Sequence, residues 1–383
     1  MVEKTRGETM DLQEIRAQID DCDRELLGLF AKRMALTSDV ARYKKEHDLP
    51  VFQEGREMQV LQKVEALTPE GLQGASRVLF TNMMDISKYL QQQDLAQDVR
   101  VTAAVAPEDG AGLPIACQGV SGAYSEAACR HLFAEPHILF RPSFEDVFHA
   151  VEEGEAVYGI LPIQNSRAGS VSQNYGLLAK RNVRIYRSVR VRIEHCLAAR
   201  PGVRLEELSA VYSHEQALRQ CAGFFAEHPH LRPVEYSNTA AAAQLVSESA
   251  EPLAAICSPE CAKLYGLAIL REELAGTENF TRFICIRRDD GLIARNADTI
   301  TVSLAISNAP SSLYRLLTKF AVAGLDLTRI ESVPFPEGGS VTALFYLDFT
   351  GSILDAPVAR LLSSLGEELP FFRLLGNYPE DGR

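Results

Sequence analysis

Residues 15–46 read IRAQIDDCDRELLGLFAKRMALTSDVARYKKE, with apolar side chains returning every three or four positions. The first of these are Ile15, Ile19, Cys22, Leu26, Leu29 and Phe30. This spacing predicts a helix with one apolar face. Asp11 is a candidate N-cap, and Glu14 three residues later completes a capping-box sequence. Because the first helix breaker is Pro50, we expect a single helix of about 35 residues, about 50 Å long.

Two shorter helices are expected to follow, one beginning near Phe52 and one over residues 75–93. The apolar face of the long first helix is too extended to be covered within one small domain, and a second copy of the same chain is the simplest cover. Residues 10–95 are therefore interpreted as an all-helical unit that serves at least as a dimerisation module.

The composition limits what the whole chain can be. Its 383 residues are enough for two or three domains, and 46% apolar with 23% charged residues excludes a fibrous or largely disordered chain. The net charge of −12 argues against a nucleic-acid binder. A helix needs about 18 apolar residues to span a bilayer, and no apolar run in the sequence is that long. The charged N-terminus does not resemble a signal peptide. The eight cysteines lack CxxC or CxxH spacing, so we expect reduced thiols, no structural zinc and a cytoplasmic protein.

The chain beyond the helices divides into three further regions. Residues 96–113 are rich in Ala, Gly, Pro and acidic residues and are interpreted as a linker. Between residues 114 and 290, short apolar strands alternate with helices, which predicts an α/β unit with ligands at the carboxyl ends of its strands. The expected strands are 115–117, 158–162, 183–188, 210–213, 254–257 and 283–286. Residues 298–378 follow the order βαββαβ, that of a ferredoxin-like α+β unit.

Several cations of the helical unit lie beside its apolar face. Arg33 and Lys44 are 11 positions apart, which brings them within about 20° of one another around the helix. Arg16 is about 100° away and in a dimer would serve the neighbouring pocket. The other polar residues of this set are Arg56, Glu57, Ser87 and Gln91. Together they predict a pocket for a small dianion inside a helical bundle. The alternative is that they are solvated charges and ordinary surface pairs.

The run from Ile15 to Leu61 and the segment MMDISKYLQQ (83–92) resemble the all-helical class of chorismate mutase. The resemblance implies that chorismate is rearranged to prephenate by binding a reactive conformer and stabilising charge on the ether oxygen, without acid, base or covalent intermediate. The pocket residues that it assigns are Arg16 from the partner subunit, Arg33, Lys44, Gln53, Arg56, Glu57, Ser87 and Gln91, with Lys44, Glu57 and Gln91 as the catalytic ones. Gln53 stands where this family usually has Asp, so we expect a shifted substrate affinity, which Gln53→Asp would test.

Five clusters of small polar residues interrupt the α/β region. They are GVSGAYSEAA (119–128), LPIQNSRAGSV (161–171), YSHEQAL (212–218), SNTAAAA (237–243) and ENFTRF (278–283). Small residues with free backbone N–H groups suit anions, but none of the clusters is a Walker A or GxGxxG sequence, so nucleotide binding is not expected. Each one taken singly could be only a loop with an N-cap, whereas five in one domain favour one shared cleft.

These clusters resemble prephenate dehydratase, continuously from Ala116 to Arg288. The resemblance implies two α/β lobes hinged about a cleft, as in periplasmic binding proteins, and loss of carbon dioxide together with the para hydroxyl of prephenate to give phenylpyruvate. It implies that Thr281 is a catalytic donor to the departing hydroxyl and that Arg282 binds a substrate carboxylate. The other expected cleft residues are Tyr124, Ser125, Gln164, Asn165, Ser166, His195, Ser213, Gln216 and Thr239. His195 is equally consistent with a core or hinge histidine.

Three positions depart from the dehydratase pattern. Gln164 stands where Glu is usual, Glu215 where Pro is usual and Gly176 where Asp is common. Gln164 is the most consequential of them, because a carboxyl group in the cleft could act as an acid whereas an amide can only orient. An active mutase with an attenuated dehydratase is therefore an alternative function, and so is a non-catalytic sensor of amino acids or small anions.

The segments NAPSSLYRLL (308–317) and RIESVPF (329–335) resemble an ACT domain, a regulatory module that binds amino acids between paired copies. The resemblance implies feedback by phenylalanine. The regulatory residues that it assigns are Ser311, Ser312, Leu313, Glu331 and Ser332. Ser311 replaces a usual Gly, which restricts close backbone approach, and Val333 replaces a usual Arg with its guanidinium donors. A dimerisation domain without a ligand is the alternative.

The three resemblances together imply a bifunctional chorismate mutase/prephenate dehydratase (P-protein) of phenylalanine biosynthesis with a C-terminal ACT domain. Neither reaction needs a metal or an organic cofactor, and the expected ligands are chorismate, prephenate and phenylalanine. The helical and C-terminal units both need partners, so we expect a homodimer or larger homo-oligomer, with no nucleic-acid or membrane partner.

Overall fold

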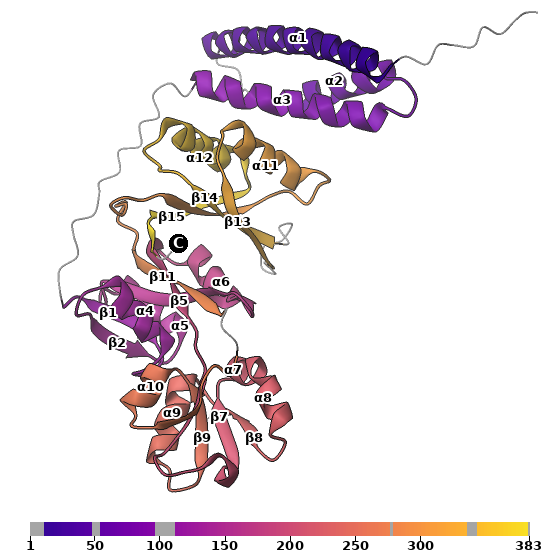
Figure 1. Ribbon diagram of the computed structural model, residues 1–383. Coiled ribbons are helices and arrows are strands. Elements are labelled where there is room, and N and C mark those ends of the chain that lie inside the picture. Colours follow the sequence, from indigo (N-terminus) through magenta and orange to yellow (C-terminus); the bar gives the residue numbers. More distant parts are fainter. Residues whose placement is uncertain (1–10, 48–53, 96–111, 276–278, 335–342, 382–383) are drawn as a thin grey trace, which may run out of the picture. The chain divides into compact units, whose positions relative to one another are not determined.

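The computed structural model describes residues 11–47, 54–95, 112–275, 279–334 and 343–381 (Figure 1). The chain divides into two compact units. The first contains residues up to 100 together with 310–324 and 359–364, and the second contains the remaining residues. None of the helices in the described ranges is both long enough and apolar enough to cross a membrane.

Three helices make up the N-terminal part of the first unit, namely α1 (Leu12–Glu46), α2 (Glu54–Leu67) and α3 (Gln73–Leu95). The prediction of one helix of about 35 residues is confirmed, because α1 contains 35. The predicted capping box is wrong, since the Asp11 side chain accepts no hydrogen bond at the N-cap position. This helix end is exposed, so water can satisfy its N–H groups. The expected helix start near Phe52 and residues 96–111 of the expected linker lie outside the described residues.

The apolar face of α1 is left in solvent by the described part of the chain. Leu26, Leu27 and Leu29 are 58%, 67% and 65% exposed, and every residue from 11 to 29 is exposed. Further along the helix, α1 contacts α3, and Ala41 is buried. Burial of these leucine side chains would stabilise the protein by about 25 cal/mol for each Å² of apolar surface. This face is therefore suited to contact another protein surface.

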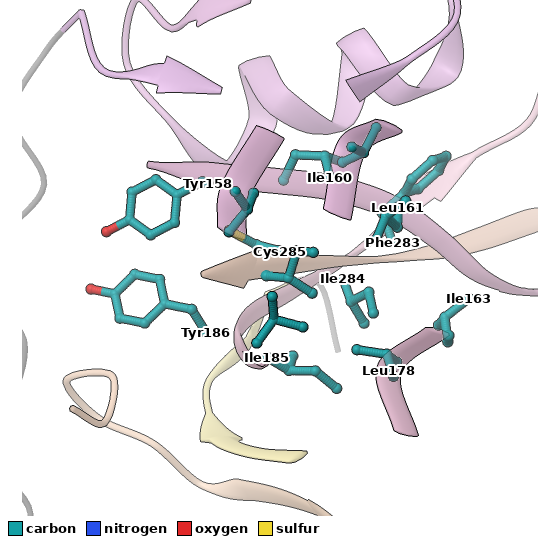
Figure 2. Close-up of a cluster of buried hydrophobic side chains, with 14 of the residues drawn as sticks. Tyr158, Ile160, Leu161, Ile163, Leu178, Ile185, Tyr186, Phe283, Ile284 and Cys285 are labelled. Carbon is teal, nitrogen blue, oxygen red and sulfur yellow. The ribbon is translucent and has the colours of Figure 1, made fainter. Parts of the chain in front are cut away.

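The second unit begins with an α/β lobe built on a sheet in the order β16-β5-β11-β3-β1-β2, with β4 paired to β3. Its strands are β1 (Pro114–Gln118), β2 (His137–Arg141), β3 (Tyr158–Asn165), β4 (Gly169–Ser170), β5 (Val183–Arg192), β11 (Phe280–Arg288) and β16 (Glu380–Asp381), and its helices are α4 (Tyr124–Leu132), α5 (Phe144–Glu152) and α6 (Ser172–Lys180). Strands β1, β2 and β3 are parallel, whereas β11 is antiparallel to both β3 and β5. Buried side chains of β3, β5 and β11, among them Ile160, Ile185 and Phe283, form the core of this lobe (Figure 2).

A second lobe has its own five-stranded sheet, in the order β10-β6-β9-β7-β8. Its elements are β6 (Cys196–Ala199), β7 (Ala210–Ser213), β8 (Arg232–Glu235), β9 (Leu253–Cys257), β10 (Ala268–Arg271), α7 (Glu215–Gln220), α8 (Ala222–Glu227), α9 (Thr239–Glu248), α10 (Pro259–Leu264) and the 3₁₀ turn η1 (Leu205–Glu207). The chain enters this lobe after β5 and leaves it before β11. The two crossing segments are bonded together, because Ile193 N–H donates to the Asn279 carbonyl (2.7 Å) and Leu274 N–H to the His195 carbonyl (2.9 Å). The predicted two-lobed α/β architecture is confirmed.

The C-terminal region has a four-stranded antiparallel sheet in the order β13-β14-β12-β15. Its elements are β12 (Thr299–Ala305), α11 (Ser312–Val322), β13 (Leu327–Pro334), β14 (Ala343–Thr350), α12 (Ala356–Glu368) and β15 (Phe371–Tyr378). The predicted βαββαβ order is confirmed. Buried contacts join this sheet to the first lobe: the Tyr346 hydroxyl donates to the Tyr175 carbonyl of α6 (2.7 Å), and β16 pairs with β5.

Candidate active sites

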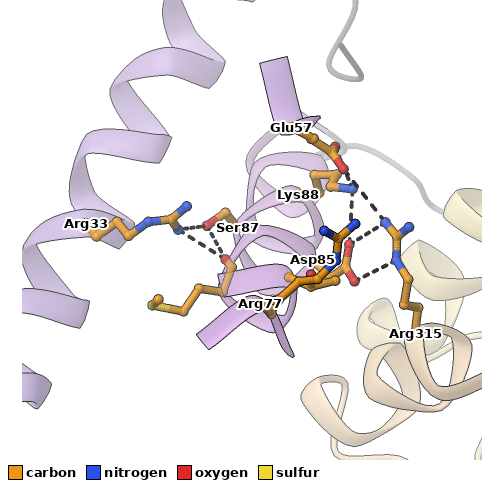
Figure 3. Close-up of polar contacts among 9 residues, drawn as sticks. Arg33, Glu57, Arg77, Asp85, Ser87, Lys88 and Arg315 are labelled. Carbon is orange, nitrogen blue, oxygen red and sulfur yellow. Dashed lines mark hydrogen bonds and ion pairs between the residues drawn. The ribbon is translucent and has the colours of Figure 1, made fainter. Parts of the chain in front are cut away.

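The helical unit brings three of the predicted substrate residues together. Arg33 of α1 donates through Nη1 to the Ser87 hydroxyl of α3 (2.6 Å) and to the Met83 carbonyl (3.2 Å), as Figure 3 shows. Ser87 and Gln91 are both buried and lie one turn apart on the same face of α3. Burial lowers the pKa of Arg33, but a guanidinium keeps its charge in proteins. The result is a half-buried cation beside neutral hydrogen-bonding groups.

Lys44 and Glu57 form a second part of this site. Burial lowers the pKa of Lys44, and the negative charge of Glu57 opposes that shift. Glu57 is also ion-paired with Lys88 of α3 (Oε1–Nζ 2.8 Å), and Lys88 lies 3.1 Å from Asp85 (Figure 3). Asp85 accepts two hydrogen bonds from Arg315 of α11 (2.8 and 2.9 Å). The predicted carboxylate at position 57 is therefore already neutralised by a cation of the chain itself.

Two predicted residues of the described part of this unit are not part of the cluster. Arg16 is on the exposed N-terminal half of α1, and its 17 residues of separation from Arg33 amount to about 25 Å along a helix. Within one chain it therefore cannot contact the groups around Arg33. Arg56 is exposed in the first turns of α2, and Gln53 lies outside the described residues.

Asn165, at the end of β3, is the centre of a hydrogen-bond network at the junction of the two α/β lobes. Its Nδ2 donates to Thr281 Oγ1 (2.9 Å) and Asn279 Oδ1 (2.9 Å). Its Oδ1 accepts from the backbone N–H groups of residues 167 and 168 (3.0 and 2.9 Å). Because only an oxygen can accept from those N–H groups, they fix which way the amide points. Asn165 and Thr281 are opposite each other on β3 and β11, and both are buried.

Gln220 and Asn279 complete this network, and neither is among the residues expected from the sequence. Gln220 Oε1 accepts from Asn279 Nδ2 (3.0 Å), and Gln220 Nε2 lies 3.5 Å from Asn165 Oδ1. Asn279 belongs to the ENFTRF cluster, so it is visible in the sequence. Gln220 follows the selected Gln216 by four positions, and this helical spacing is the one signal in the sequence that points to it.

His195 lies on the segment that enters the second lobe, and its ring is buried. Its Nε2 is 3.1 Å from Gln220 Oε1, an oxygen that can only accept, so Nε2 carries the proton. Burial lowers the pKa of His195. The hydrogen bond to Gln220 acts to raise it, and the positive charge of Arg167 lowers it further. The imidazole is therefore neutral near pH 7, and its Nδ1 lies 3.5 Å from the Tyr124 hydroxyl. This histidine lies on a segment that connects the two lobes and is a member of the network.

Gln164 and Arg282 do not face this network. They are opposite each other on β3 and β11, and because side chains alternate along a strand, they point away from Asn165 and Thr281. Both line a pocket of about 760 Å³ on the other side of the sheet. The Arg282 guanidinium is ion-paired with Asp348 of β14 (2.5 Å), so the structure does not support the expectation that it binds a substrate carboxylate. Strand alternation likewise does not place Gln164 beside Thr281, and both expectations stay predictions.

The other predicted dehydratase residues are spread around the two lobes. The buried Ser213 hydroxyl donates to the Ile256 carbonyl of β9 (2.7 Å). Ser166 Oγ accepts from Phe280 N–H (3.0 Å), and Ser166 lines the same pocket as Gln164. The Tyr124 hydroxyl donates to the Glu194 carbonyl. Ser125, Gln216 and Thr239 lie in the first turns of α4, α7 and α9.

The loop GVSG (119–122) has the composition of an anion site, but Glu126 of the same chain occupies it. The Glu126 carboxylate accepts from Gly122 N–H (2.6 Å) and the Ser121 hydroxyl (3.1 Å), and it pairs with Arg130 (2.7 Å). Burial acts to raise the pKa of Glu126, but these hydrogen bonds outweigh it and leave the pKa below its ordinary value. Gly122 has φ +87°, and a Cβ there would come within 3.0 Å of Cys261 Sγ. The loop is therefore a structural turn.

Two positions of the C-terminal region explain its departures from the ACT pattern. Ser311 precedes α11 with φ +67°, in the left-handed region that glycine adopts most readily. Val333 is buried in the hydrophobic core of the second unit, so a guanidinium at this position could not reach a ligand without leaving the core. Ser312 and Leu313 lie in the first turn of α11, and Glu331 and Ser332 lie on β13.

Two protein-family models match this chain. Chorismate mutase type II matches residues 15–92, and prephenate dehydratase matches residues 115–291. The bifunctional chorismate mutase/prephenate dehydratase of Escherichia coli (strain K12) is 30% identical over 97% of this chain and 96% of its own length. Arogenate dehydratase/prephenate dehydratase 2 of Arabidopsis thaliana is 34% identical over 71% of this chain and 74% of its own. The solved prephenate dehydratase from Arthrobacter aurescens, in complex with L-Phe, is 32% identical with a TM-score of 0.64, over 70% of this chain and 90% of its own.

A helical mutase unit and a two-lobed α/β dehydratase unit in one chain define an enzyme with two active sites. The chain belongs to the family of bifunctional chorismate mutase/prephenate dehydratases. It rearranges chorismate to prephenate and converts prephenate to phenylpyruvate, which are consecutive steps of phenylalanine biosynthesis. The alternative of a non-catalytic sensor is thereby set aside.

Proposed function

We propose that Thr281 donates a hydrogen bond to the departing hydroxyl of prephenate in the dehydratase reaction. The observation that carries this proposal is the bond from Asn165 Nδ2 to Thr281 Oγ1 (2.9 Å). An amide nitrogen can only donate, so Thr281 Oγ1 is the acceptor in this bond and its own hydrogen is available for another oxygen. The two backbone donors to Asn165 Oδ1 exclude the flipped amide. Thr281 is thereby oriented as a donor before the substrate arrives.

The elimination needs no reactant besides prephenate and a proton. The bond between the ring and its carboxylate breaks and releases carbon dioxide, and the electrons of that bond complete the aromatic ring. The bond to the para hydroxyl breaks at the same time, and the hydroxide takes up the proton and leaves as water. Aromatisation supplies the driving force, so the protein has to orient the substrate and stabilise the departing oxygen. Neutral His195 is assigned to orienting Gln220, not to supplying the proton.

For the mutase reaction, Arg33 binds a carboxylate of chorismate, Lys44 the ether oxygen and Gln91 completes the pocket. The contact between Arg33 and Ser87 (2.6 Å) supports this assignment, because the serine holds the guanidinium in a fixed direction. Arg16 reaches the pocket from a second copy of the chain. The exposed apolar face of α1 is the surface through which the two copies pair. A homodimer is therefore the smallest complete mutase.

The C-terminal region acts as an ACT domain that binds phenylalanine and reduces dehydratase activity. Its βαββαβ order supports this role, and so does the relative from Arthrobacter aurescens, which was solved in complex with L-Phe. The proposed regulatory residues are Ser311, Ser312, Leu313, Glu331 and Ser332. The buried position of Val333 excludes it from ligand contact, so its difference from the usual Arg does not by itself abolish binding.

The decisive experiment compares Thr281→Val with Thr281→Ser in the full-length chain. Valine keeps the shape of threonine but lacks the hydroxyl, so phenylpyruvate formation from prephenate should fall by about 10²- to 10³-fold. Serine keeps the hydroxyl and should retain much of the activity. Conversion of chorismate to prephenate should be equal in both variants and is the control for the helical unit, and circular dichroism of both variants is the control for folding of the dehydratase unit. Substantial dehydratase activity in Thr281→Val would refute the role of the hydroxyl.

The same assays test the substrate range and the regulation. Prephenate and arogenate are supplied in separate reactions, because plant relatives are named for arogenate. Consumption of arogenate would show that this dehydratase site also accepts an amino group on the substrate side chain. Phenylalanine is then added at increasing concentration with prephenate, and unaltered turnover would contradict the proposed ACT function.

A further inference from the structure

Arg282 is held by three residues of the C-terminal region. Its Nη1 lies 2.5 Å from Asp348 Oδ2, its Nε 2.8 Å from Glu380 Oε1 and its Nη2 3.1 Å from the Tyr378 hydroxyl. The side chains of Arg282, Asp348 and Glu380 are 9%, 5% and 4% exposed. Thr301 of β12 adds a hydrogen bond to Asp348 Oδ1 (2.7 Å). Charges buried to this extent are tolerated only when they are paired with opposite charges. The ion pairs therefore hold the Arg282 side chain in one position.

The residue before Arg282 is Thr281, and the two side chains lie on opposite faces of β11. Thr281 faces Asn165 in the catalytic network, whereas Arg282 faces the C-terminal sheet. The two residues share one peptide unit, so a rotation of residue 282 also moves the Thr281 hydroxyl. A displacement of about 1 Å at a reacting group can cost about 10²-fold in rate.

We propose that Arg282 is a positioning residue of the dehydratase reaction and that Asp348 of the C-terminal sheet anchors it. The ion cluster fixes the direction of β11 at its start and thereby the direction of the Thr281 hydroxyl. The anchor is 66 positions further along the chain than Arg282, beyond the residues that match the dehydratase family. This inference rests on the role proposed for Thr281, and it adds that a residue outside the two lobes sets the geometry of their active site.

The cluster borders the pocket of about 760 Å³, which makes a chemical test feasible. Arg282, Asp348 and Glu380 all line this pocket, together with the half-exposed Arg190. A carboxylate that is removed by mutation can therefore be replaced by a small carboxylate such as formate from solution. Asp326 lines the same pocket and is exposed, so it offers a matched control in which a pocket carboxylate is lost without touching Arg282.

The experiment measures prephenate turnover by the full-length Asp348→Ala variant with and without sodium formate. We expect kcat to fall by about ten- to a hundredfold with KM little changed, because a positioning residue acts through Thr281 and not through a contact of its own with the substrate. Formate should restore part of the lost kcat. Asp326→Ala and the unaltered enzyme should show neither the loss nor the response to formate. Chorismate mutase activity, measured in the same samples, reports the folded helical unit, and the thermal unfolding of each variant followed by circular dichroism reports whether the second unit is folded.

An unchanged kcat in folded Asp348→Ala would overturn the proposal. A loss that formate does not relieve and Asp348→Glu does not reduce would also overturn it, because the cluster would then serve folding alone. Thr281→Val is measured in parallel to separate the two proposals. If Thr281→Val is inactive while Asp348→Ala is fully active, only the positioning role fails. If Thr281→Val is active, the role of Thr281 fails, and with it the reason for positioning it.

Discussion

Gln164 and Arg282 lie directly opposite each other on two neighbouring strands, on the side of the sheet that faces away from the Thr281 hydroxyl. The amide at position 164, where dehydratases usually carry Glu, is therefore outside the hydrogen-bond network of Asn165 and Thr281. A carboxylate at this position would lie near a guanidinium that Asp348 and Glu380 already neutralise. The difference between Gln and Glu at this position is therefore not evidence for a weakened dehydratase.

Gln164→Glu is predicted to leave kcat for prephenate unchanged. The new carboxyl group cannot reach the departing hydroxyl from the opposite face of the sheet, so it cannot act as the acid. Steady-state kinetics of the variant and the unaltered enzyme, measured on the same preparation of prephenate, provide the check. A clear increase in kcat would mean that position 164 has access to the cleft.

Glu126 is predicted to stabilise the folded protein in a pH-dependent manner. Its pKa is lower in the folded protein than its ordinary value, so the folded state binds fewer protons than the unfolded state near that value. The stabilisation is fully present above the unfolded pKa of about 4.3 and is lost as the pH falls through the lowered folded value. Glu126→Gln should therefore reduce the free energy of unfolding more at pH 7 than at pH 3. Urea unfolding at both pH values tests this, with exposed Glu153→Gln as control, and an equal cost at both would contradict it.

Ser311→Gly is predicted to increase stability. Residue 311 has φ +67°, a conformation that costs about 1–2 kcal/mol for a residue with a side chain. Glycine removes this cost, but it loses more conformational entropy on folding, which offsets part of the gain. A net gain of at most about 1 kcal/mol is expected. Calorimetry should show a higher unfolding temperature, whereas Ser312→Gly, inside the helix, should lower it. If both variants are destabilised, the serine has a role beyond its backbone conformation.

Leu27→Asp is predicted to produce a monomer that has lost mutase activity but keeps dehydratase activity. Leu27 is 67% exposed on the face of α1 that the described chain leaves uncovered, and a charge there would have to be buried between two copies. Light scattering gives the oligomeric state, and the two assays give the activities. Gln13→Asp adds the same charge at an exposed polar position of this helix and should behave as the unaltered enzyme. A monomer with full mutase activity would show that Arg16 of a second copy is not needed.

Local patterns in the sequence were sufficient for most of the fold. The 35-residue α1 and the βαββαβ order depend on periodicity within single segments, and both were predicted. Strands β2, β6, β8 and β10 were not. They have only four or five residues each, and three of them lie at sheet edges, so they offer too few alternations for a period of two to be recognised.

The difference between the expected and the observed surroundings of Arg282 has a specific cause. The strand expected at 283–286 begins at Phe280, so residues 281 and 282 belong to a strand and not to a loop. Side chains that are adjacent in a loop can share a pocket, but adjacent side chains in a strand face opposite ways. The place of Gln220 in the network depends on how the two lobes meet, and its helical spacing from Gln216 is too weak a signal to predict that.

The two crossing segments between the lobes carry His195 and Asn279, and both are bonded to Gln220 of the second lobe. Any opening of the lobes would lengthen these bonds before it affects the strands themselves. If the lobes open to exchange ligands with solvent, the bonds of Gln220 break and the Asn165–Thr281 network loses its support from the second lobe. In that case the slower of the opening and closing steps sets an upper limit on turnover, however fast the elimination itself is.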